Sequence, residues 1–362
     1  MDSNPQILAF ATQGAFGNDE ARLRALLEKF KQVEFFEFDS KRKWKSFFGL
    51  VRLLQKKKPD LVVMEGSGIA GGGAVILGRL LFGTPYLVSS GDAIAPFLSR
   101  RIKVLTPFFY FYERLLCRLC QGFIGWSPYF TGRALTFGAP RAMSVPGWSP
   151  HQILGSEREA LRSEFRQKWG IKEKDIVIGI VGSLRWNSKV DYCYGLELVE
   201  CAHEVKRSDL KFLVVGEGSG LPYLKSRAPK ENVIFTGFIE REKLKGALAA
   251  MDLASLPQSL DQVGLFRYTT KFSEYFASGL PIVCSQIPAA YDLDFGGIWR
   301  IPGRTPWGKD YSKNLAHFLE NVTAVEISEK RENFKKVDFL FDRDFQISQF
   351  TSFLRELCAR GE

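Results

Sequence analysis

The stretch from Ser255 to Ser285 constrains the fold more than any other part of the chain, because it reads as loop, helix, stop and strand. Thr269 and Thr270 are residues of the type that caps a helix N-terminus. Gly279 is placed to end that helix, and Pro281 blocks its continuation. The apolar residues that follow Pro281 predict a buried strand. A helix followed directly by a buried strand is typical of α/β proteins with a parallel sheet.

The same alternation of apolar strands and amphipathic helices runs along the whole chain of 362 residues, which is long enough for two domains. We expect strands at 6–12, 143–148 and 176–184, and at the starts of 59–73, 84–97 and 210–228. A polar helical segment at 149–170 predicts the linker and the first helix of a second domain. An amphipathic helix is expected at 345–357.

The residues of the opening helix form a recognisable motif, (T/S)-K-x-x-E-Y-x-A-x-G-x-P-(I/V)-V. It stands here as Thr270, Lys271, Glu274, Tyr275, Ala277, Gly279, Pro281, Ile282 and Val283. This motif resembles the donor site of GT-B glycosyltransferases, in particular retaining family 4. The resemblance implies an α/β protein with two Rossmann-like domains facing a central cleft. Residues 1–150, with the helix at 345–362 packing back, would form the acceptor domain, and residues 165–343 the nucleotide-sugar donor domain.

The resemblance also implies roles in donor binding. Glu274 would hold the ribose hydroxyls, and Thr270 and Lys271 belong to the same helix start. Backbone N–H groups of Gly264 and Leu265 would stabilise the leaving diphosphate. The remaining donor positions are the base wall at Gly237, Phe238 and Ile239 and the strand end at Gly182. The first Gly-rich loop, with Gly14 and Gly17, would lie against the donor phosphate or the acceptor, and a tight turn without ligand contact is the alternative.

Three further residues are candidates for the chemistry itself. Arg185 and Lys189 follow the strand that ends at Gly182, where a guanidinium and an ammonium suit a diphosphate. A surface pair of charges is the alternative. Asp92 follows a strand end and is the candidate acceptor-side group, although it is also placed to cap the next helix.

Two departures from the family pattern keep other functions open. The position eight residues before Glu274, where many members have a second glutamate, is Phe266, and no histidine lies near Asp92. A non-catalytic scaffold of GT-B shape is therefore one alternative. Gly66, Gly68 and Gly71 match G-x-G-x-x-G, so an NAD(P)-dependent oxidoreductase is another.

The charge of the chain narrows its possible binding partners. The net charge of +10 permits a phosphorylated ligand or an anionic membrane, and no nucleic-acid-binding motif is present. Residues 41–58 carry eight basic residues, no acidic one, and an apolar side with Trp44, which reads either as a membrane-surface helix or as a packed domain helix. We assign no metal to Asp292 and Asp294, and no cofactor beyond the nucleotide-sugar.

Localisation follows from the cysteines and from the absence of a targeting pattern in this sequence. Cys117 and Cys120 are expected as two buried thiols in a reducing cytoplasm. The residues at 1–14 lack the pattern of a signal peptide, and no run of about 18 apolar residues predicts a membrane span. We expect a cytoplasmic protein that can lie on the inner face of a membrane.

Overall fold

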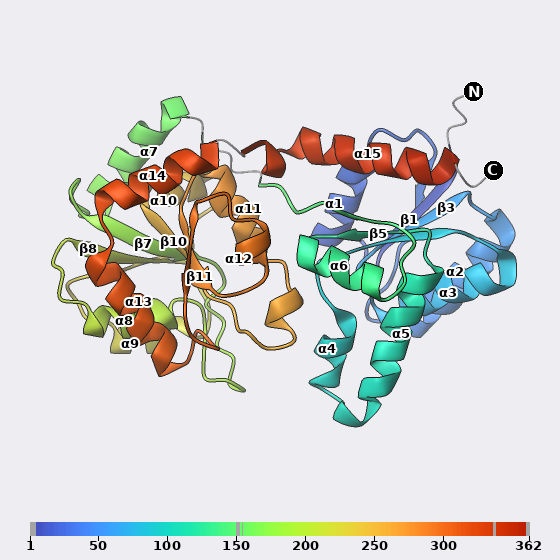
Figure 1. The fold of residues 1–362 in the computed structure, drawn as a ribbon, viewed down its shortest axis with the longest axis horizontal. Helices are drawn as coiled ribbons and strands as arrows, with labels where there is room; N and C mark the ends of the chain where they lie inside the picture. The colour runs from blue at the N-terminus through green and yellow to red at the C-terminus, as the bar shows by residue number, and fades with distance from the viewer. Residues whose placement is uncertain (1–4, 150–152, 154, 336–337, 360–362) are drawn as a thin grey trace. The chain divides into compact units, whose positions relative to one another are not determined.

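Two compact units make up the computed structural model, which describes residues 5–149, 153, 155–335 and 338–359. Unit 1 comprises Met1–Gly147, Phe266–Tyr268 and Arg343–Glu362, and unit 2 comprises Trp148–Leu265 and Thr269–Asp342. The assignment of the short segment 266–268 to unit 1 has no counterpart in the sequence prediction. The α/β class and the two Rossmann-like domains are confirmed (Figure 1).

Unit 1 contains a parallel sheet with the strand order β2-β1-β3-β4-β5-β6. The strands are β1 (Ile7–Ala11), β2 (Val33–Phe35), β3 (Leu61–Glu65), β4 (Tyr86–Ser90), β5 (Gly122–Gly125) and β6 (Ala142–Ser144). Strands β1, β3, β4 and β5 are buried along their whole length, which explains why they read as apolar runs.

Helices cover both faces of this sheet. They are α1 (Asn18–Leu26), α2 (Lys43–Lys57), α3 (Ile69–Phe82), α4 (Ile94–Ser99), α5 (Thr106–Leu119), α6 (Pro128–Thr136) and α15 (Arg343–Ala359), with a 3₁₀ turn η1 at Lys103–Leu105. The C-terminal helix α15 packs on this unit, where the amide of Gln121 donates to the Leu357 carbonyl over 3.0 Å.

Unit 2 repeats the plan with the strand order β12-β11-β10-β7-β8-β9. Its strands are β7 (Ile176–Val181), β8 (Leu210–Val215), β9 (Val233–Gly237), β10 (Leu253–Leu256), β11 (Ile282–Ser285) and β12 (Ile298–Ile301). Every pairing between these strands is parallel.

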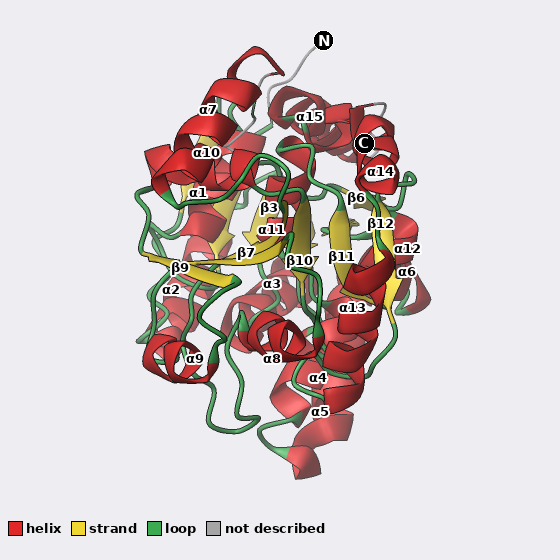
Figure 2. Cartoon of the chain, turned by 90° about the vertical axis from the view of Figure 1, so that its left-hand side faces the viewer, coloured by secondary structure: helices red, strands yellow, loops and turns green. Residues whose placement is uncertain are grey.

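Helices of unit 2 also lie on both faces of its sheet. They are α7 (Gly155–Lys168), α8 (Leu196–Glu204), α9 (Leu221–Arg227), α10 (Leu244–Ala250), α11 (Thr270–Ala277), α12 (Ala289–Asp292), α13 (Lys309–Asn321) and α14 (Ala324–Lys335), with 3₁₀ turns at Arg241–Lys243, Gly264–Phe266 and Asp338–Phe341. Figure 2 shows α8 and α13 on one side of the strands and α7 and α10 on the other. A core of apolar side chains from the strands, α8 and α13 joins these layers.

The helix predicted from the opening motif is α11, and its termination follows the sequence. Gly279 takes the left-handed conformation with φ +57°, and its N–H donates to the Phe276 carbonyl over 2.8 Å. The N-cap differs from our expectation, because the side chain of Thr269 makes no capping hydrogen bond and Thr270 is exposed.

The glycines that imitate a dinucleotide motif make room for side chains of unit 1. A β-carbon at Gly66, whose φ is +82°, would lie 2.3 Å from the Thr12 hydroxyl oxygen. One at Gly71 would lie 2.8 Å from the Phe10 ring, and one at Gly72 would lie 1.9 Å from the hydroxyl of Tyr112. These glycines are explained by packing of α3 against β1 and α5.

The thiols of Cys117 and Cys120 are free and buried, as expected. Burial raises the pKa of Cys120 to about 12, and it also raises the pKa of Cys117. Among the described residues, no helix combines the length and the apolar character needed to cross a membrane.

Candidate functional site

The strand order of unit 2 reverses between β7 and β10, which are neighbours in the sheet although β8 and β9 separate them in the chain. Ligands of open α/β sheets bind beyond the carboxyl ends of the strands at such a switch point. The segments that leave this point are the loop after β7, with Gly182 and Arg185, and the loop after β10 that leads to α11. The motif residues of the sequence are therefore positioned by the topology.

The loop after β7 lies directly against the loop after β8, backbone to backbone. A β-carbon at Gly216, whose φ is +137°, would lie 1.9 Å from the Gly182 carbonyl oxygen. One at Gly218 would lie 2.3 Å from the Leu184 carbonyl carbon. Hydrogen bonds from Gly182 N–H to Val215 (3.0 Å) and from Leu184 N–H to Glu217 (2.9 Å) hold the two loops together. Only glycine permits this approach.

The predicted base wall adjoins the same place. Gly237 ends β9 with φ +71°, and its carbonyl accepts a hydrogen bond from the Gly216 N–H over 3.0 Å. The next side chain, Phe238, is 69% exposed, and Ile239 is half-buried. An exposed aromatic ring beside a backbone wall is suited to stack on a planar ligand.

Helix α11 brings Lys271 to this wall. A β-carbon at Gly182 would lie 2.9 Å from the Lys271 Cε atom, so the lysine side chain occupies the space that glycine leaves. The Lys271 ammonium also lies 4.4 Å from the centre of the Tyr194 ring. The structure thus brings together Gly182 and Lys271, and it adds Tyr194, which the sequence reasoning missed.

Glu274 lies one turn further along α11 and is half-buried. Burial raises the pKa of its carboxyl above the usual range, while Lys271 and Arg241 pull it down. Within the described part of the chain, this carboxylate makes no hydrogen bond and no ion pair. A half-buried carboxylate without a protein partner is suited to accept hydrogen bonds from a ligand.

A buried hydrogen-bond network fixes the strands and helices that carry these residues. The Glu197 carboxylate accepts from the Tyr192 hydroxyl over 2.8 Å and from the Ser255 hydroxyl over 3.1 Å. The Tyr275 hydroxyl donates to the Ser255 carbonyl over 3.2 Å and accepts from the Val181 N–H over 3.4 Å. These bonds tie α8, β10, α11 and β7 together. Burial raises the pKa of Glu197 to about 7.

The loop before α11 differs from our expectation. The N–H of Gly264 donates to the Asp261 carboxylate over 2.9 Å, and the N–H of Leu265 donates to the Asp261 carbonyl over 2.9 Å. In addition, the Gln258 carboxamide donates to the Gly264 carbonyl. Because the loop uses these amides internally, they do not face a ligand in this structure. An aspartate three residues before a glycine is a turn signal that the sequence reasoning passed over.

Arg185 and Lys189 are placed in the loop after β7, and both side chains are exposed. The loop itself is ordered by local bonds, since the Trp186 N–H donates to the Ser219 hydroxyl over 3.0 Å and the Lys189 N–H to the Asn187 side chain over 3.1 Å. Within the part of the chain that the structure describes, neither side chain forms an ion pair.

In unit 1, Asp92 follows β4 and pairs with Arg267 over 3.1 Å, with both side chains about half exposed. It does not cap α4, which has Ala93 at its N-cap without a side-chain bond. Phe266, at the position of the family's second glutamate, stacks on Tyr129 with ring centres 5.0 Å apart. These contacts lie within unit 1 as defined above.

Beside Asp92, unit 1 holds a buried ion pair that the sequence reasoning missed. Arg22 on α1 donates to Glu65 at the end of β3 over 3.0 Å and lies 4.4 Å from the Trp126 ring centre. Burial raises the pKa of Glu65, and its Oε1 has no hydrogen-bond partner among the described residues. A glutamate at the end of an otherwise apolar strand was the available signal. Gly14 and Gly17 lie in the loop between β1 and α1 of the same unit.

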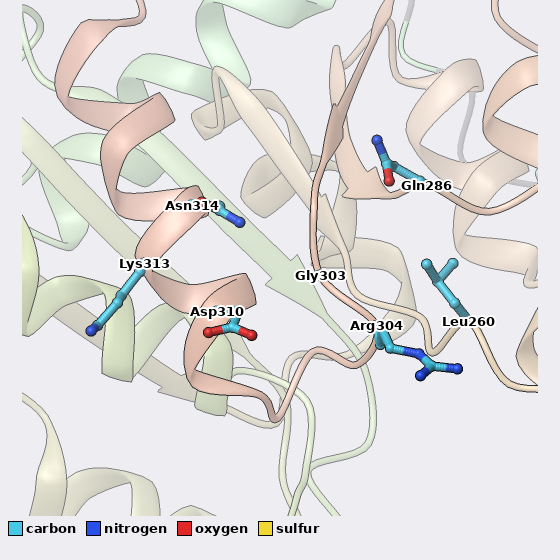
Figure 3. Close-up of a pocket in the computed structure, with 7 residues that line it drawn as sticks. All are labelled: Leu260, Gln286, Gly303, Arg304, Asp310, Lys313 and Asn314. Atoms are coloured by element: carbon cyan, nitrogen blue, oxygen red, sulfur yellow. The ribbon is translucent and has the colours of Figure 1, made fainter.

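A separate surface pocket of about 510 Å³ lies at the ends of β11 and β12 (Figure 3). It is lined by Leu260, Gln286, Gly303, Arg304, Asp310, Lys313 and Asn314, the last three from α13. None of the residues predicted to bind a donor lines this pocket. Asp294, of the D-x-D sequence, instead pairs with Arg300 over 2.6 Å and accepts from the N–H groups of 296–298.

Residues 175–298 match the family model described as Glycosyl transferases group 1. The matched segment runs from β7 to the start of β12 and contains Gly182, Lys271 and Glu274. The resemblance to glycosyltransferases inferred from the motif of α11 is thereby confirmed, and assignment to the retaining family 4 stays a prediction.

Curated relatives agree with this match. An alpha-D-kanosaminyltransferase of Streptomyces kanamyceticus is 28% identical over 173 residues, which cover 45% of this chain and 42% of the relative. A GDP-mannose-dependent alpha-mannosyltransferase of Corynebacterium glutamicum is 24% identical over 259 residues, 68% of this chain and 55% of the relative. The chain thus spans about half the length of these relatives.

Solved structures resemble the whole chain. HepE of Anabaena, in complex with UDP and glucose, gives a TM-score of 0.67 at 16% identity and covers 97% of this chain and 100% of its own. Sucrose-phosphate synthase of Thermosynechococcus elongatus gives 0.67 at 13% identity, with 98% and 99% covered. These similarities establish the GT-B fold.

Proposed function

The chain has the GT-B fold and carries a group 1 glycosyl transferase segment at 175–298, and from this premise we propose that it transfers a sugar from a nucleotide-sugar to a hydroxyl acceptor. The observation that carries the proposal is the arrangement at the switch point of unit 2. There, Lys271 lies against Gly182, and the carboxylate of Glu274, which has no partner among the described residues, lies one helical turn away.

The proposed donor orientation follows from the chemistry of these groups. Glu274 accepts hydrogen bonds from the ribose hydroxyls, and Phe238 and the Gly237 backbone contact the base. Lys271 and Arg185 lie toward the diphosphate, with Lys189 as a further cation. This order replaces our expectation for Gly264 and Leu265, whose N–H groups are engaged by Asp261.

In the proposed reaction the protein performs mainly electrostatic work. The bond between the anomeric carbon and the diphosphate oxygen breaks, and the diphosphate gains negative charge that Arg185 and Lys271 stabilise. The acceptor hydroxyl attacks the anomeric carbon and gives its proton to the departing diphosphate oxygen. On the acceptor side, the groups proposed to contact the substrates are Asp92 and the loop with Gly14 and Gly17.

We further propose that the reaction retains the anomeric configuration and needs no bound metal. Retention is the usual outcome in the family that the α11 motif resembles. For the metal, the relevant observation is that the Asp294 carboxylate is already taken up by Arg300 and backbone amides. Nuclear magnetic resonance of the product and activity in a chelator test the two points separately.

The names of the relatives guide the choice of donors. UDP-glucose and GDP-mannose are the first candidates, since solved and curated relatives carry UDP with glucose or use GDP-mannose. The acceptor is proposed to be a glycan or a lipid-linked precursor at the cytoplasmic face of a membrane. The segment proposed to face that membrane is 41–58, which contains α2 and whose basic residues are all exposed.

A thermal-shift panel tests the proposal. A nucleotide-sugar at 100 times its Kd adds about 2.7 kcal/mol to the free energy of unfolding. We expect such a shift with one nucleotide-sugar, a reduced shift in Glu274→Ala, and none with NAD or NADP. A shift with NAD(P) alone would favour an oxidoreductase. Binding without release of the nucleoside diphosphate, over a broad panel of acceptors, would favour a non-catalytic scaffold.

A further inference from the structure

The connection between α4 and α5 exposes large apolar side chains to solvent. All six residues from Arg100 to Leu105 are exposed, and Val104 is 83% exposed. The first turns of α5 add Phe108 and Phe111, of which Phe111 is 63% exposed. Figure 1 shows α4 and α5 extending side by side to this connection. We call residues 100–111 the α4–α5 tip.

The exposed side chains of α5 lie on a helix whose other face is packed in the core of unit 1. The inward face of α5 carries Phe109, Tyr112, Glu113 and Leu116, which are buried at helical spacing. The Tyr112 hydroxyl contacts the Gly68 carbonyl at 3.0 Å. The outward face of the same turns is also apolar. A helix that is apolar on both faces leaves one of them for a partner outside the fold.

The charges around these apolar residues have one sign. Arg100, Arg101 and Lys103 lie within the α4–α5 tip, and the sequence has no acidic residue between Asp92 and Glu113. Glu113 does not offset them, because its carboxylate is buried against Arg133 at 2.9 Å. Apolar side chains interleaved with basic ones are suited to a surface that presents both hydrocarbon and negative charge.

The positive net charge of the chain is concentrated in the segment that contains the α4–α5 tip. Residues 1–147 contain 20 Lys and Arg against 11 Asp and Glu, whereas residues 148–362 contain 30 against 29. The first segment therefore carries +9 of the net charge of +10. Two copies of this face would repel one another, so the charge favours an anionic partner over a second copy of the chain.

We infer that the α4–α5 tip inserts into the interfacial region of an anionic lipid bilayer. Val104, Phe108 and Phe111 enter the boundary between headgroups and acyl chains, to a depth of about 5–10 Å. The flanking arginine and lysine side chains extend to the lipid phosphates. This inference concerns lipid binding and stands independently of the proposed transfer reaction.

The first turn of α2 is placed to reach the same bilayer. A β-carbon at Gly73 of α3 would lie 3.4 Å from the Phe47 ring of α2, and one at the adjacent Gly72 would meet the Tyr112 hydroxyl of α5. Phe47 in the second turn of α2 and Tyr112 in the second turn of α5 therefore lie at the same level on either side of α3. Trp44, which is 67% exposed on α2, and the α4–α5 tip flank α3 in unit 1.

Vesicle co-sedimentation of the full chain tests the inference. The parent should bind vesicles of phosphatidylcholine with phosphatidylglycerol at low salt, and neutral phosphatidylcholine vesicles much less. The double variant Val104→Ser, Phe111→Ser should lower the vesicle partition coefficient by about tenfold or more. The valine and phenylalanine side chains gain free energy when they move from water into the bilayer, and serine does not. A matched control is Val325→Ser, Tyr291→Ser, which removes two exposed apolar side chains of unit 2 and should bind as the parent does.

Labelling distinguishes insertion from loose electrostatic contact. A Val104→Cys variant labelled with an environment-sensitive fluorophore should shift to the blue on anionic vesicles, and labelled Val325→Cys should not. Five of the six native cysteines are buried and the sixth, Cys358, is half-buried, so both variants also carry Cys358→Ser and the label reports the new thiol. Equal vesicle binding by the parent and the Val104→Ser, Phe111→Ser variant would overturn the inference. So would a change of oligomeric state in that variant with unchanged vesicle binding, because the face would then be covered by a second copy.

Discussion

The Lys271 ammonium lies 4.4 Å from the centre of the Tyr194 ring, and its side chain fills the space above Gly182. The three residues come from the start of α11, the segment before α8 and the loop that follows β7. The quadrupole of an aromatic ring attracts a cation over its face, which helps to hold the Lys271 side chain in this position. The wall of the proposed donor site is thus set by a contact that only glycine at 182 permits.

Gly182→Ala should weaken donor binding while leaving the fold intact. The new methyl group would lie 2.9 Å from the Lys271 Cε atom, and a flexible lysine end can move away from it. We expect donor affinity to fall by roughly tenfold, since a hydrogen bond to a charged group contributes about 1.5–3 kcal/mol. Gly132→Ala on α6, whose β-carbon would contact nothing within 4 Å, is the control. Titration calorimetry with unchanged affinity in Gly182→Ala would remove Lys271 from the site.

Arg185→Ala should lower kcat more than it raises KM. Its proposed partner, the leaving diphosphate, gains charge as the glycosidic bond breaks, so the interaction is strongest in the transition state. Arg185→Lys should recover only part of the rate, because the bidentate fork is lost. Steady-state kinetics provide the measurement, with Arg227→Ala, a surface residue paired with Glu200, as the control. Parental turnover in Arg185→Ala would exclude this residue from catalysis.

Glu197 should make the stability of the parent depend on pH. Burial raises its pKa in the folded state from 4.5 to about 7, so the folded protein binds the proton more tightly than the unfolded chain. The resulting stabilisation is present below about pH 4.5 and is lost as the pH rises through about 7, by up to about 3 kcal/mol.

Urea denaturation of the parent and Glu197→Gln between pH 5 and 7.5 measures this effect. The free energy of unfolding of the parent, relative to the variant, should decrease as the pH rises. Glu204→Gln, an exposed glutamate on the same helix α8, is the control. A difference between parent and Glu197→Gln that is constant over this range would refute the assignment.

Replacing Lys41, Arg42 and Lys43, which are exposed at the start of α2, by glutamate should weaken binding to anionic vesicles at low salt. Each basic residue near such a surface contributes about 1 kcal/mol, and the attraction decays over a Debye length of roughly 8 Å. A control with the same charge change replaces three exposed lysines of unit 2, at 225, 309 and 313. Co-sedimentation at two salt concentrations compares them. Equal loss in both variants would indicate a non-specific charge effect.

The sequence predicted the fold and helix α11 because these depend on local signals. The stop at Gly279 and the apolar strands follow from backbone conformation and burial, and both are found. Helix α2 packs as a domain helix, since Leu50 and Leu54 are buried, and the membrane interpretation of 41–58 stays a prediction that the exposed Trp44 permits.

Other features depend on contacts between residues far apart in the chain, and the sequence did not predict them. The pairing of Arg22 with Glu65 and the placement of Tyr194 against Lys271 require the parallel sheet to be assembled first. The sequence also did not predict that the Gly264 N–H, which we expected to face the donor, donates to Asp261 within the loop. The spacing of Gly66 and Gly71 also left a dinucleotide site as an alternative, whereas in the structure these glycines make room for Thr12 and Phe10.

The most direct test of the proposed donor site compares a nucleoside diphosphate with its 2′,3′-dideoxy analogue, using the nucleotide selected by the thermal-shift panel. Both ligands are titrated into the parent and into Glu274→Ala. If the Glu274 carboxylate holds the ribose hydroxyls, the parent should lose roughly tenfold or more in affinity for the analogue, and the variant should bind both ligands equally. An equal loss of affinity in parent and variant would contradict the assignment of Glu274 and, with it, the donor site at the β7–β10 switch point.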